Sequence, residues 1–260
     1  MPTRRKALLG RYDAHTHTTF SDGRNSVLEN ARAAEACGLE TLIITDHVFG
    51  DAPWLGNMLR EVEAADAACA TKVLAGAEGV ILNPAGEISI TEEIAARLDF
   101  VLVDFGGRTE GIAADPPANQ ARLIKNVVSA VTKACANPLV DAIAHPLNLG
   151  RFPAVLSPVD FKAAPLIEMA TAFEETRTAF EIMNQLPWWF PDHSVERITA
   201  EYADVLHLFA RFGVRFIVGS DAHSCGAVGN LRWCERVMAA AGLGDEHLID
   251  IPLAGERRKP

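Results

Sequence analysis

The stretch Arg11-Tyr12-Asp13-Ala14-His15-Thr16-His17 is the first of several short strand-like runs that end in a histidine or a carboxylate. In a β-strand, the spacing of His15 and His17 places both imidazoles on the same face. Two imidazoles on one face suit a single metal ion, but this pair alone is a weak signal. Whether this pair indicates a metal site depends on which residues lie at the ends of the later strands.

Short strand-like runs alternate with longer helical stretches along the whole chain. The predicted strands are Arg11–Thr16, Thr41–Thr45, Lys72–Leu82, Phe100–Phe105, Ala142–His145, Ala179–Met183 and Arg215–Ser220. The predicted helices are Val27–Cys37, Met58–Ala70, Ala118–Cys135, Asp160–Thr176, Val195–Phe212 and Leu231–Ala241. This alternation implies parallel strand pairing with the helices outside, so it predicts an α/β fold of the (β/α)7, TIM-like barrel type. A doubly wound open sheet is the alternative.

The length and the connecting segments favour one domain over residues 1–260, because α/β barrels reach this size as single units. Gly79–Ile90 contains the turn Asn83-Pro84-Ala85-Gly86 and predicts a hairpin extension. Arg108–Asn119, with one further glycine and two prolines, predicts a loop on the barrel rim.

Composition narrows the class of protein. The chain holds 24 Lys and Arg against 34 Asp and Glu, a formal charge of −10, which argues against binding nucleic acid or an anionic membrane. Its five cysteines form no Cys-x-x-Cys pair, so neither a disulfide framework nor a zinc finger is indicated. With neither a secretory signal nor a membrane span expected, the predicted location is cytoplasmic; the oligomeric state stays open.

Imidazole and carboxylate side chains cluster where the predicted strands end. They are His15, His17, Asp46, His47, Glu78, His145, Asp221 and His223. The C-terminal ends of parallel barrel strands meet at one rim, which is where the active sites of such barrels lie. Imidazoles mixed with carboxylates suit Zn²⁺, Mn²⁺ or Fe²⁺, and the number of candidates exceeds what one ion needs. The sequence therefore predicts two or three divalent transition metal ions at this rim.

The motifs together resemble the polymerase and histidinol phosphatase (PHP) family from about Tyr12 to about Gly229. They are His15-Thr16-His17-Thr18, Ser21-Asp22-Gly23, Thr45-Asp46-His47, Gly76-Ala77-Glu78, His145-Pro146, Phe180-Glu181 and Ser220-Asp221-Ala222-His223. The resemblance implies a distorted seven-stranded barrel with a trinuclear metal site that hydrolyses phosphate esters. The implied shells are, for the first ion, His15, His17, Glu78 and Asp221, for the second, Glu78 and His145, and for the third, Asp22, His47 and His223. Glu181 is expected beside the ligands.

One position departs from the family pattern. Family members usually end the fourth strand with a histidine that completes the second ion's shell, and Gly106 stands there in this chain. Asp104 lies two residues earlier and so on the same strand face, and it is the candidate to substitute as an oxygen ligand. Water is the other candidate.

The expected chemistry is attack on phosphorus by a metal-activated hydroxide, in a small phosphorylated metabolite or nucleotide. Asp22 or His223 is expected to pass a proton to the leaving alkoxide. Arg151, on the loop after His145-Pro146, is the first candidate to grip the phosphate through its guanidinium fork. The aromatic run Pro187–Pro191 is either a wall of the substrate site or a packed loop.

Three other functions fit the pattern less well. A 3′–5′ exonuclease-like phosphodiesterase conflicts with the acidic charge, and a degenerate barrel that binds metal without turnover would not need so many ligands. An amidohydrolase also begins with His-x-His, but that class usually places a bridging lysine after its fourth strand, where this chain has Asp104, Gly106 and Gly107.

Overall fold

A computed structural model describes residues 8–251. Within this range the strands form one parallel sheet that curves almost into a closed barrel. The strands are β1 (Tyr12–Thr16), β2 (Thr41–Ile44), β3 (His47–Val48), β4 (Lys72–Val80), β5 (Phe100–Asp104), β6 (Ala142–Ile143), β7 (Ala179–Met183) and β8 (Phe216–Gly219). The sheet order is β1-β2-β4-β5-β6-β7-β8, and the short β3 pairs with β4. Each of these pairs is parallel.

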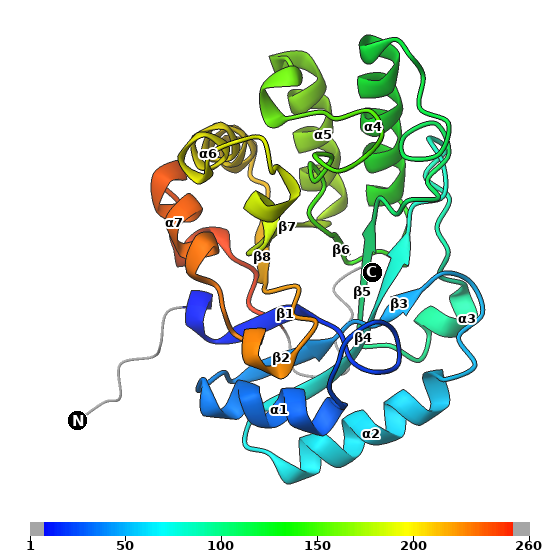
Figure 1. Cartoon of the computed structure of the whole chain (residues 1–260), viewed down its shortest axis with the longest axis vertical. Helices are drawn as coiled ribbons and strands as arrows, with labels where there is room; N and C mark the ends of the chain where they lie inside the picture. Colours follow the sequence, from blue (N-terminus) through cyan, green and yellow to red (C-terminus); the bar gives the residue numbers. More distant parts are fainter. Residues whose placement is uncertain (1–7, 252–260) are drawn as a thin grey trace.

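Main-chain hydrogen bonds between the first and last strand regions nearly close the sheet into a barrel (Figure 1). The N–H of Asp221 donates to the carbonyl of His15 at 2.9 Å, and the N–H of His17 donates to the carbonyl of Ala222 at 2.9 Å. The prediction of a TIM-like barrel is therefore confirmed, and the alternative of a doubly wound open sheet is wrong. The fold is a distorted TIM-like barrel.

Helices pack around the outside of the barrel in neighbouring pairs, α1 with α2, α4 with α5 and α6 with α7 (Figure 1). They are α1 (Val27–Ala36), α2 (Leu55–Ala68), α3 (Glu92–Ala95), α4 (Gln120–Cys135), α5 (Ala163–Thr176), α6 (Val195–Arg211) and α7 (Arg232–Ala241). Local sequence sets several starts: Ser26 and Glu29 form a capping box on α1, and the side chain of Ser194 caps α6. Within residues 8–251, no helix is both long and apolar enough to cross a membrane.

The structure differs from the predicted elements mainly at the strand ends. The predicted second strand breaks after Ile44, and His47 starts β3, where it pairs in register with Glu78. The predicted strand Ala142–His145 is only two residues long, and His145 lies beyond it. The hairpin expected in Gly79–Ile90 is confirmed by an antiparallel bridge between Ile81 and Ile88.

Asp13 in β1 joins the two edges of the barrel from inside. Its carboxylate is fully buried and accepts hydrogen bonds from the N–H of Ser220 at 2.8 Å and of Gly229 at 2.9 Å. Burial raises the pKa of Asp13, and the hydrogen bonds that it accepts oppose this rise. The role of Asp13 has no signal in the sequence, because the partners of a carboxylate inside a strand become apparent only when the last strand lies beside it.

Replacing Asp13 with alanine leaves a buried main-chain N–H of Ser220 without its acceptor, and such a loss costs about 1–3 kcal/mol per group. We expect Asp13→Ala to lower the free energy of unfolding by about 2–4 kcal/mol in denaturant titrations. Asp13→Asn, which keeps one acceptor oxygen, should lose less. Alanine at the exposed Asp192 is the matched control, and a loss of equal size there would contradict this role for Asp13.

Candidate metal centre

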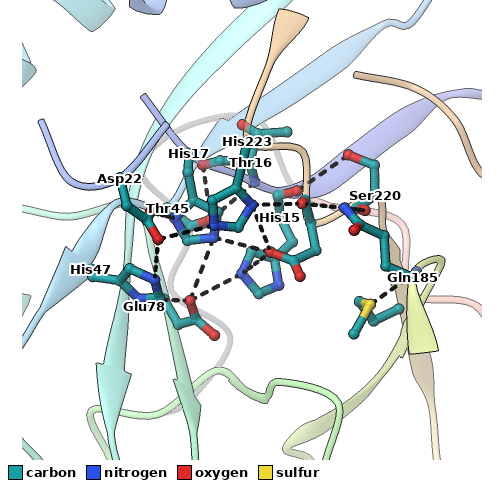
Figure 2. Close-up of polar contacts among 12 residues, drawn as sticks. His15, Thr16, His17, Asp22, Thr45, His47, Glu78, Gln185, Ser220 and His223 are labelled. Carbon is teal, nitrogen blue, oxygen red and sulfur yellow. Dashed lines mark hydrogen bonds and ion pairs between the residues drawn. The ribbon is translucent and has the colours of Figure 1, made fainter. Parts of the chain in front are cut away.

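The residues predicted to ligate metal converge at the C-terminal ends of the strands (Figure 2). His15 lies near the C-terminal end of β1, Glu78 lies near the C-terminal end of β4, and His145 follows β6. His17 and Asp22 come from the loop after β1, where Figure 2 shows Asp22 facing His47. The imidazoles of His15 and His17 are completely buried, whereas Asp22 is half exposed and faces the mouth of the cluster.

The carboxylate of Glu78 is the centre of the inner part of the cluster. One oxygen, Oε2, lies 3.2 Å from Nε2 of His15 and 3.0 Å from Nδ1 of His47. The other, Oε1, lies 3.3 Å from Nε2 of His145. Because its two oxygens face different histidines, Glu78 has the geometry of a bridging group.

Two further carboxylates, Asp22 and Asp221, complete the cluster, and Asp22 is the more exposed of the two. Oδ2 of Asp22 lies 3.2 Å from Nε2 of His223 and 3.6 Å from Nε2 of His47. Oδ1 of Asp221 lies 3.2 Å from Nε2 of His17 and 3.6 Å from Nδ1 of His223. His17 and His223 stack with ring centroids 4.4 Å apart, so the buried and the more exposed parts of the cluster are continuous.

Ligand atoms close enough to share an ion fall into three groups, in each of which they lie within 4.8 Å of one another. The groups are His17, Asp22, His47 and His223; His15, His17 and Asp221; and His15, Glu78 and His145. Every residue proposed as a ligand from the sequence occurs in at least one group. The grouping differs from the expected one in three ways. Glu78 is absent from the group of His15, His17 and Asp221, His17 also joins Asp22, His47 and His223, and His15 joins Glu78 and His145.

Glu181 in β7 holds two of these residues in place. Its Oε1 lies 2.8 Å from Nδ1 of His15, and its Oε2 accepts the main-chain N–H of His145 at 3.0 Å. With Nδ1 of His15 occupied in this way, Nε2 faces the cluster. Gly219 makes room for this contact, since a Cβ there would lie 2.2 Å from Oε1 of Glu181.

Asp46, a motif residue not proposed as a ligand, positions the loop that carries Asp22. Its buried carboxylate accepts the N–H of Thr18 at 2.8 Å and the hydroxyls of Thr18 and Ser21 at 2.6 and 2.5 Å. These bonds fold the chain after His17 back over the barrel, which brings Asp22 to His47 and His223. The strand-end pattern pointed to Asp46 but could not distinguish a ligand from a loop anchor.

Two cluster residues adopt a left-handed backbone that is uncommon outside glycine. His145 has φ 33° and Asp221 has φ 55°. Each is held from outside, His145 by Glu181 and Asp221 by Gln185, whose Nε2 donates to the Asp221 carbonyl at 2.7 Å. Such strain costs about 1–3 kcal/mol per residue and gathers at functional sites, where the surrounding structure maintains it.

The carboxylates favour protonation of most imidazoles in the cluster, whereas burial lowers the pKa of His17. Burial opposes the protonation of His47, but the charge of Glu78 and the contact with Asp22 raise its pKa from 6.5 to about 11. Burial also opposes the protonation of His145, and the contact with Glu78 and the charge of Glu181 raise its pKa from 6.5 to about 9. The cluster therefore attracts positive charge, which a bound cation supplies in place of these protons.

The acidic groups shift in opposite directions according to their partners. Contacts with His223 and His47 hold the pKa of Asp22 far below its ordinary value. Burial and the nearby charge of Glu78 raise the pKa of Asp104 from 3.8 to about 7. Asp104 lies on the same face of the sheet as Glu78, but it belongs to none of the three ligand groups.

The donor atoms fit a divalent metal centre. Nε2 of His15, both ring nitrogens of His17 and Nδ1 of His47 are buried without a properly directed hydrogen bond, although carboxylate oxygens lie nearby. Buried polar atoms in native proteins nearly always have a partner, so nitrogens and oxygens that face a common space without bonding to each other indicate a cation site. Neutral imidazole with carboxylate is the donor set of Zn²⁺, Mn²⁺ and Fe²⁺.

The other residues predicted to line the site, the aromatic run and Arg151, lie on loops around the cluster. The ring of Trp189 stacks on His145 with centroids 6.4 Å apart, so this residue of the aromatic run lies beside the cluster. The Arg151 guanidinium lies 3.4 Å from the centroid of Trp188, and its Nε donates to the Trp188 carbonyl at 3.1 Å. Arg151 is thus packed against Trp188, the neighbour of Trp189.

A nearly closed α/β barrel with a histidine and carboxylate cluster at its strand ends defines a metal-dependent hydrolase. A scan against models of protein families finds no match. The chain is 30% identical over 220 residues to a probable phosphatase of Acetivibrio thermocellus, covering 84% of this chain and 81% of the relative. It is also 30% identical over 242 residues to a probable phosphatase of Photobacterium profundum, covering 91% and 88%.

The fold is shared with a crystal structure of histidinol phosphate phosphatase from Lactococcus lactis, which was solved with zinc, L-histidinol and phosphate. The TM-score is 0.66 at 18% identity, over 92% of this chain and 95% of that one. The chain belongs to the family that contains these probable phosphatases, the PHP family, and it is a metal-dependent phosphoesterase. The resemblance inferred from the motifs is therefore confirmed.

The raised pKa of His145 predicts how the stability of the metal-free protein depends on pH. The folded state binds the His145 proton more tightly than the unfolded state, so this stabilisation is complete below pH 6.5 and is lost as the pH rises through about 9. We expect the free energy of unfolding of chelator-treated wild type to fall by about 1–3 kcal/mol more than that of His145→Gln across this interval. His207→Gln, in α6 outside the cluster, should follow the wild type; parallel profiles for all three proteins would contradict the prediction.

Proposed function

We propose that this protein is a phosphatase that hydrolyses small phosphate monoesters at the cluster of His15, His17, Asp22, His47, Glu78, His145, Asp221 and His223. The observation that carries the proposal is the convergence of all eight side chains into overlapping ligand groups with buried, unpartnered ring nitrogens. The relatives named probable phosphatases support a monoester substrate, as does the phosphate-bound histidinol phosphate phosphatase of the same fold.

Two or three Zn²⁺, Mn²⁺ or Fe²⁺ ions are the proposed occupants. The outer group of His17, Asp22, His47 and His223 has four ligands and needs no other residue. The two inner groups share His15, and each offers one carboxylate, from Asp221 or from Glu78. Since His15 and His17 each belong to two groups, the ligand set supports two ions and accommodates a third.

Divalent ions held here supply Lewis acidity, which makes hydroxide available near neutral pH and offsets the charge of the phosphoryl oxygens. The protein's own residues prepare the site for this chemistry. Glu181 holds His15 with Nε2 facing the cluster, and Asp46 fixes the loop that carries Asp22. His223 and Asp22, joined at 3.2 Å, are the most exposed members of the cluster, so this pair is placed to pass a proton to the departing alkoxide. His223 carries the proton, because its contact with Asp22 raises its pKa while Asp22 stays ionised.

Metal content and turnover test this proposal together. We expect protein purified without chelator to contain two or three transition metal ions per chain by elemental analysis. It should hydrolyse p-nitrophenyl phosphate faster than bis-p-nitrophenyl phosphate and lose activity on chelation. Glu78→Gln should remove at least one ion and lower kcat by about 100-fold or more, because Glu78 contacts ligands of both inner and outer groups.

His207→Gln is the matched control, because it replaces a histidine outside the cluster and should keep both metal and activity. Faster hydrolysis of the diester would instead favour an exonuclease-like phosphodiesterase. A full metal complement without turnover on either ester would favour the degenerate barrel, and a protein that takes up no metal would overturn the proposal.

Arg151 remains the proposed phosphate grip, although its guanidinium stacks on Trp188. Its Nε is engaged with the Trp188 carbonyl, which leaves the two terminal nitrogens for an anion approaching along the aromatic run. Arg151→Ala should raise KM for p-nitrophenyl phosphate about tenfold and change the free energy of unfolding by less than about 1 kcal/mol. An unchanged KM would remove Arg151 from the site.

A further inference from the structure

A pocket of about 280 Å³ lies beside the metal centre, and none of the residues assigned to the chemistry lines it. Its walls are formed by Phe49, Val80, Leu82, Gly106, Gly107 and Arg108. These residues come from the C-terminal end of β4 and from the segments that follow β3, β4 and β5, so the pocket opens at the same end of the barrel as the cluster. We call it the side pocket.

Two contacts tie the side pocket to the cluster. Val80 follows Glu78 by two residues in β4, so both side chains point to the same face of the sheet, about 7 Å apart along the strand. The ring of Phe49 stacks on the imidazole of His47 with centroids 5.0 Å apart. A phosphate ester with its phosphoryl group at the cluster therefore has its organic part within reach of the side pocket.

Two consecutive lining residues of the pocket, Gly106 and Gly107, have no side chain. A Cβ on Gly106 would lie 3.1 Å from both γ-methyl groups of Val80, whereas a Cβ on Gly107 would meet no atom within 4 Å. A side chain at Gly106 would press against Val80, and one at Gly107 has open space to occupy.

The lining has a distinct chemical character. Its side chains are apolar except for Arg108, and Phe49 is 60% exposed, which leaves the aromatic ring available to a ligand. Arg108 is exposed and forms no salt bridge with any residue of the described range 8–251. An apolar recess with one unpaired cation suits an apolar ligand that carries a negative charge.

We propose that the side pocket binds the organic part of the substrate, and that this part is an aromatic or other compact apolar group bearing a second anionic group that pairs with Arg108. This assignment rests on the phosphatase function proposed above and narrows it to one substrate class. Phosphate monoesters of hydroxylated aromatic acids are the simplest members of that class.

Kinetics on two aryl phosphates test the charge preference. For Arg108→Ala, we expect kcat/KM for 4-carboxyphenyl phosphate to fall about tenfold more than kcat/KM for phenyl phosphate, because only the first substrate has a carboxylate. Comparing variant with wild type on each substrate cancels the different reactivity of the two leaving groups. Arg122→Ala, an exposed arginine in α4, is the matched control and should treat both substrates like the wild type.

A second variant tests the volume of the pocket. Gly107→Leu places a side chain into the open space without meeting a described atom at its Cβ, so it should lower kcat/KM for both aryl phosphates by about tenfold or more. Ion content and thermal unfolding of this variant should match those of the wild type, which separates a filled pocket from a damaged fold.

Binding of 4-hydroxybenzoate, followed by ligand-observed NMR, tests the pocket without turnover. We expect it to bind the wild type, to bind Arg108→Ala about tenfold more weakly, and to be lost in Gly107→Leu. If wild type binds this acid in the expected pattern but hydrolyses no phosphate ester, the phosphatase proposal fails and the side pocket stands. If the esters are hydrolysed but both variants behave like Arg122→Ala in kinetics and binding, the side pocket proposal is overturned alone.

Discussion

Closure of the sheet between its first and last strands is the constraint on which the site depends. The main chain of His15 accepts a hydrogen bond from Asp221, and that of His17 donates one to Ala222, so the bonds that close the barrel run through the metal-binding motifs themselves. Asp13 adds a buried carboxylate that joins the same two edges. The fold and the cluster are thus maintained by one set of contacts, and neither is built independently of the other.

Building the cluster into the closed end of the barrel costs free energy. Burying imidazoles with carboxylates costs solvation, and left-handed backbone at His145 and Asp221 adds strain. Glu181 compensates part of that cost, because one carboxylate orients the ring of His15 and holds the main chain of His145. The upward shift in the pKa of His47 and His145 has a related cause, because the neighbouring carboxylates favour positive charge at these positions.

The ligand candidates could be found in the sequence because parallel strands project their carboxyl ends to one rim. His15, Glu78, His145 and Asp221 each lie at or just beyond a recognisable strand, and the order of the motifs identified the family. The points at which a predicted strand is interrupted were harder to predict from the sequence. Thr45 and Asp46 look like the end of a strand, yet Asp46 turns to bind Thr18 and Ser21, and His47 begins a separate strand. A single sequence carries no signal for such a partner 25 to 28 residues away.

The sequence by itself determined the class of fold, the family and the list of residues able to hold metal, since period-2 strands, helical stretches and strand-end histidines are all local patterns. Only the tertiary structure decided which of those residues lie close enough to share an ion, because His15 and His17 each belong to two groups and this depends on the orientation of each ring. It also decided the place of Arg151 on Trp188 and the hollow beside Gly106 and Gly107. The Arg151–Trp188 contact and the pocket both form where loops from distant parts of the chain lie side by side. A local sequence pattern does not predict such long-range contacts.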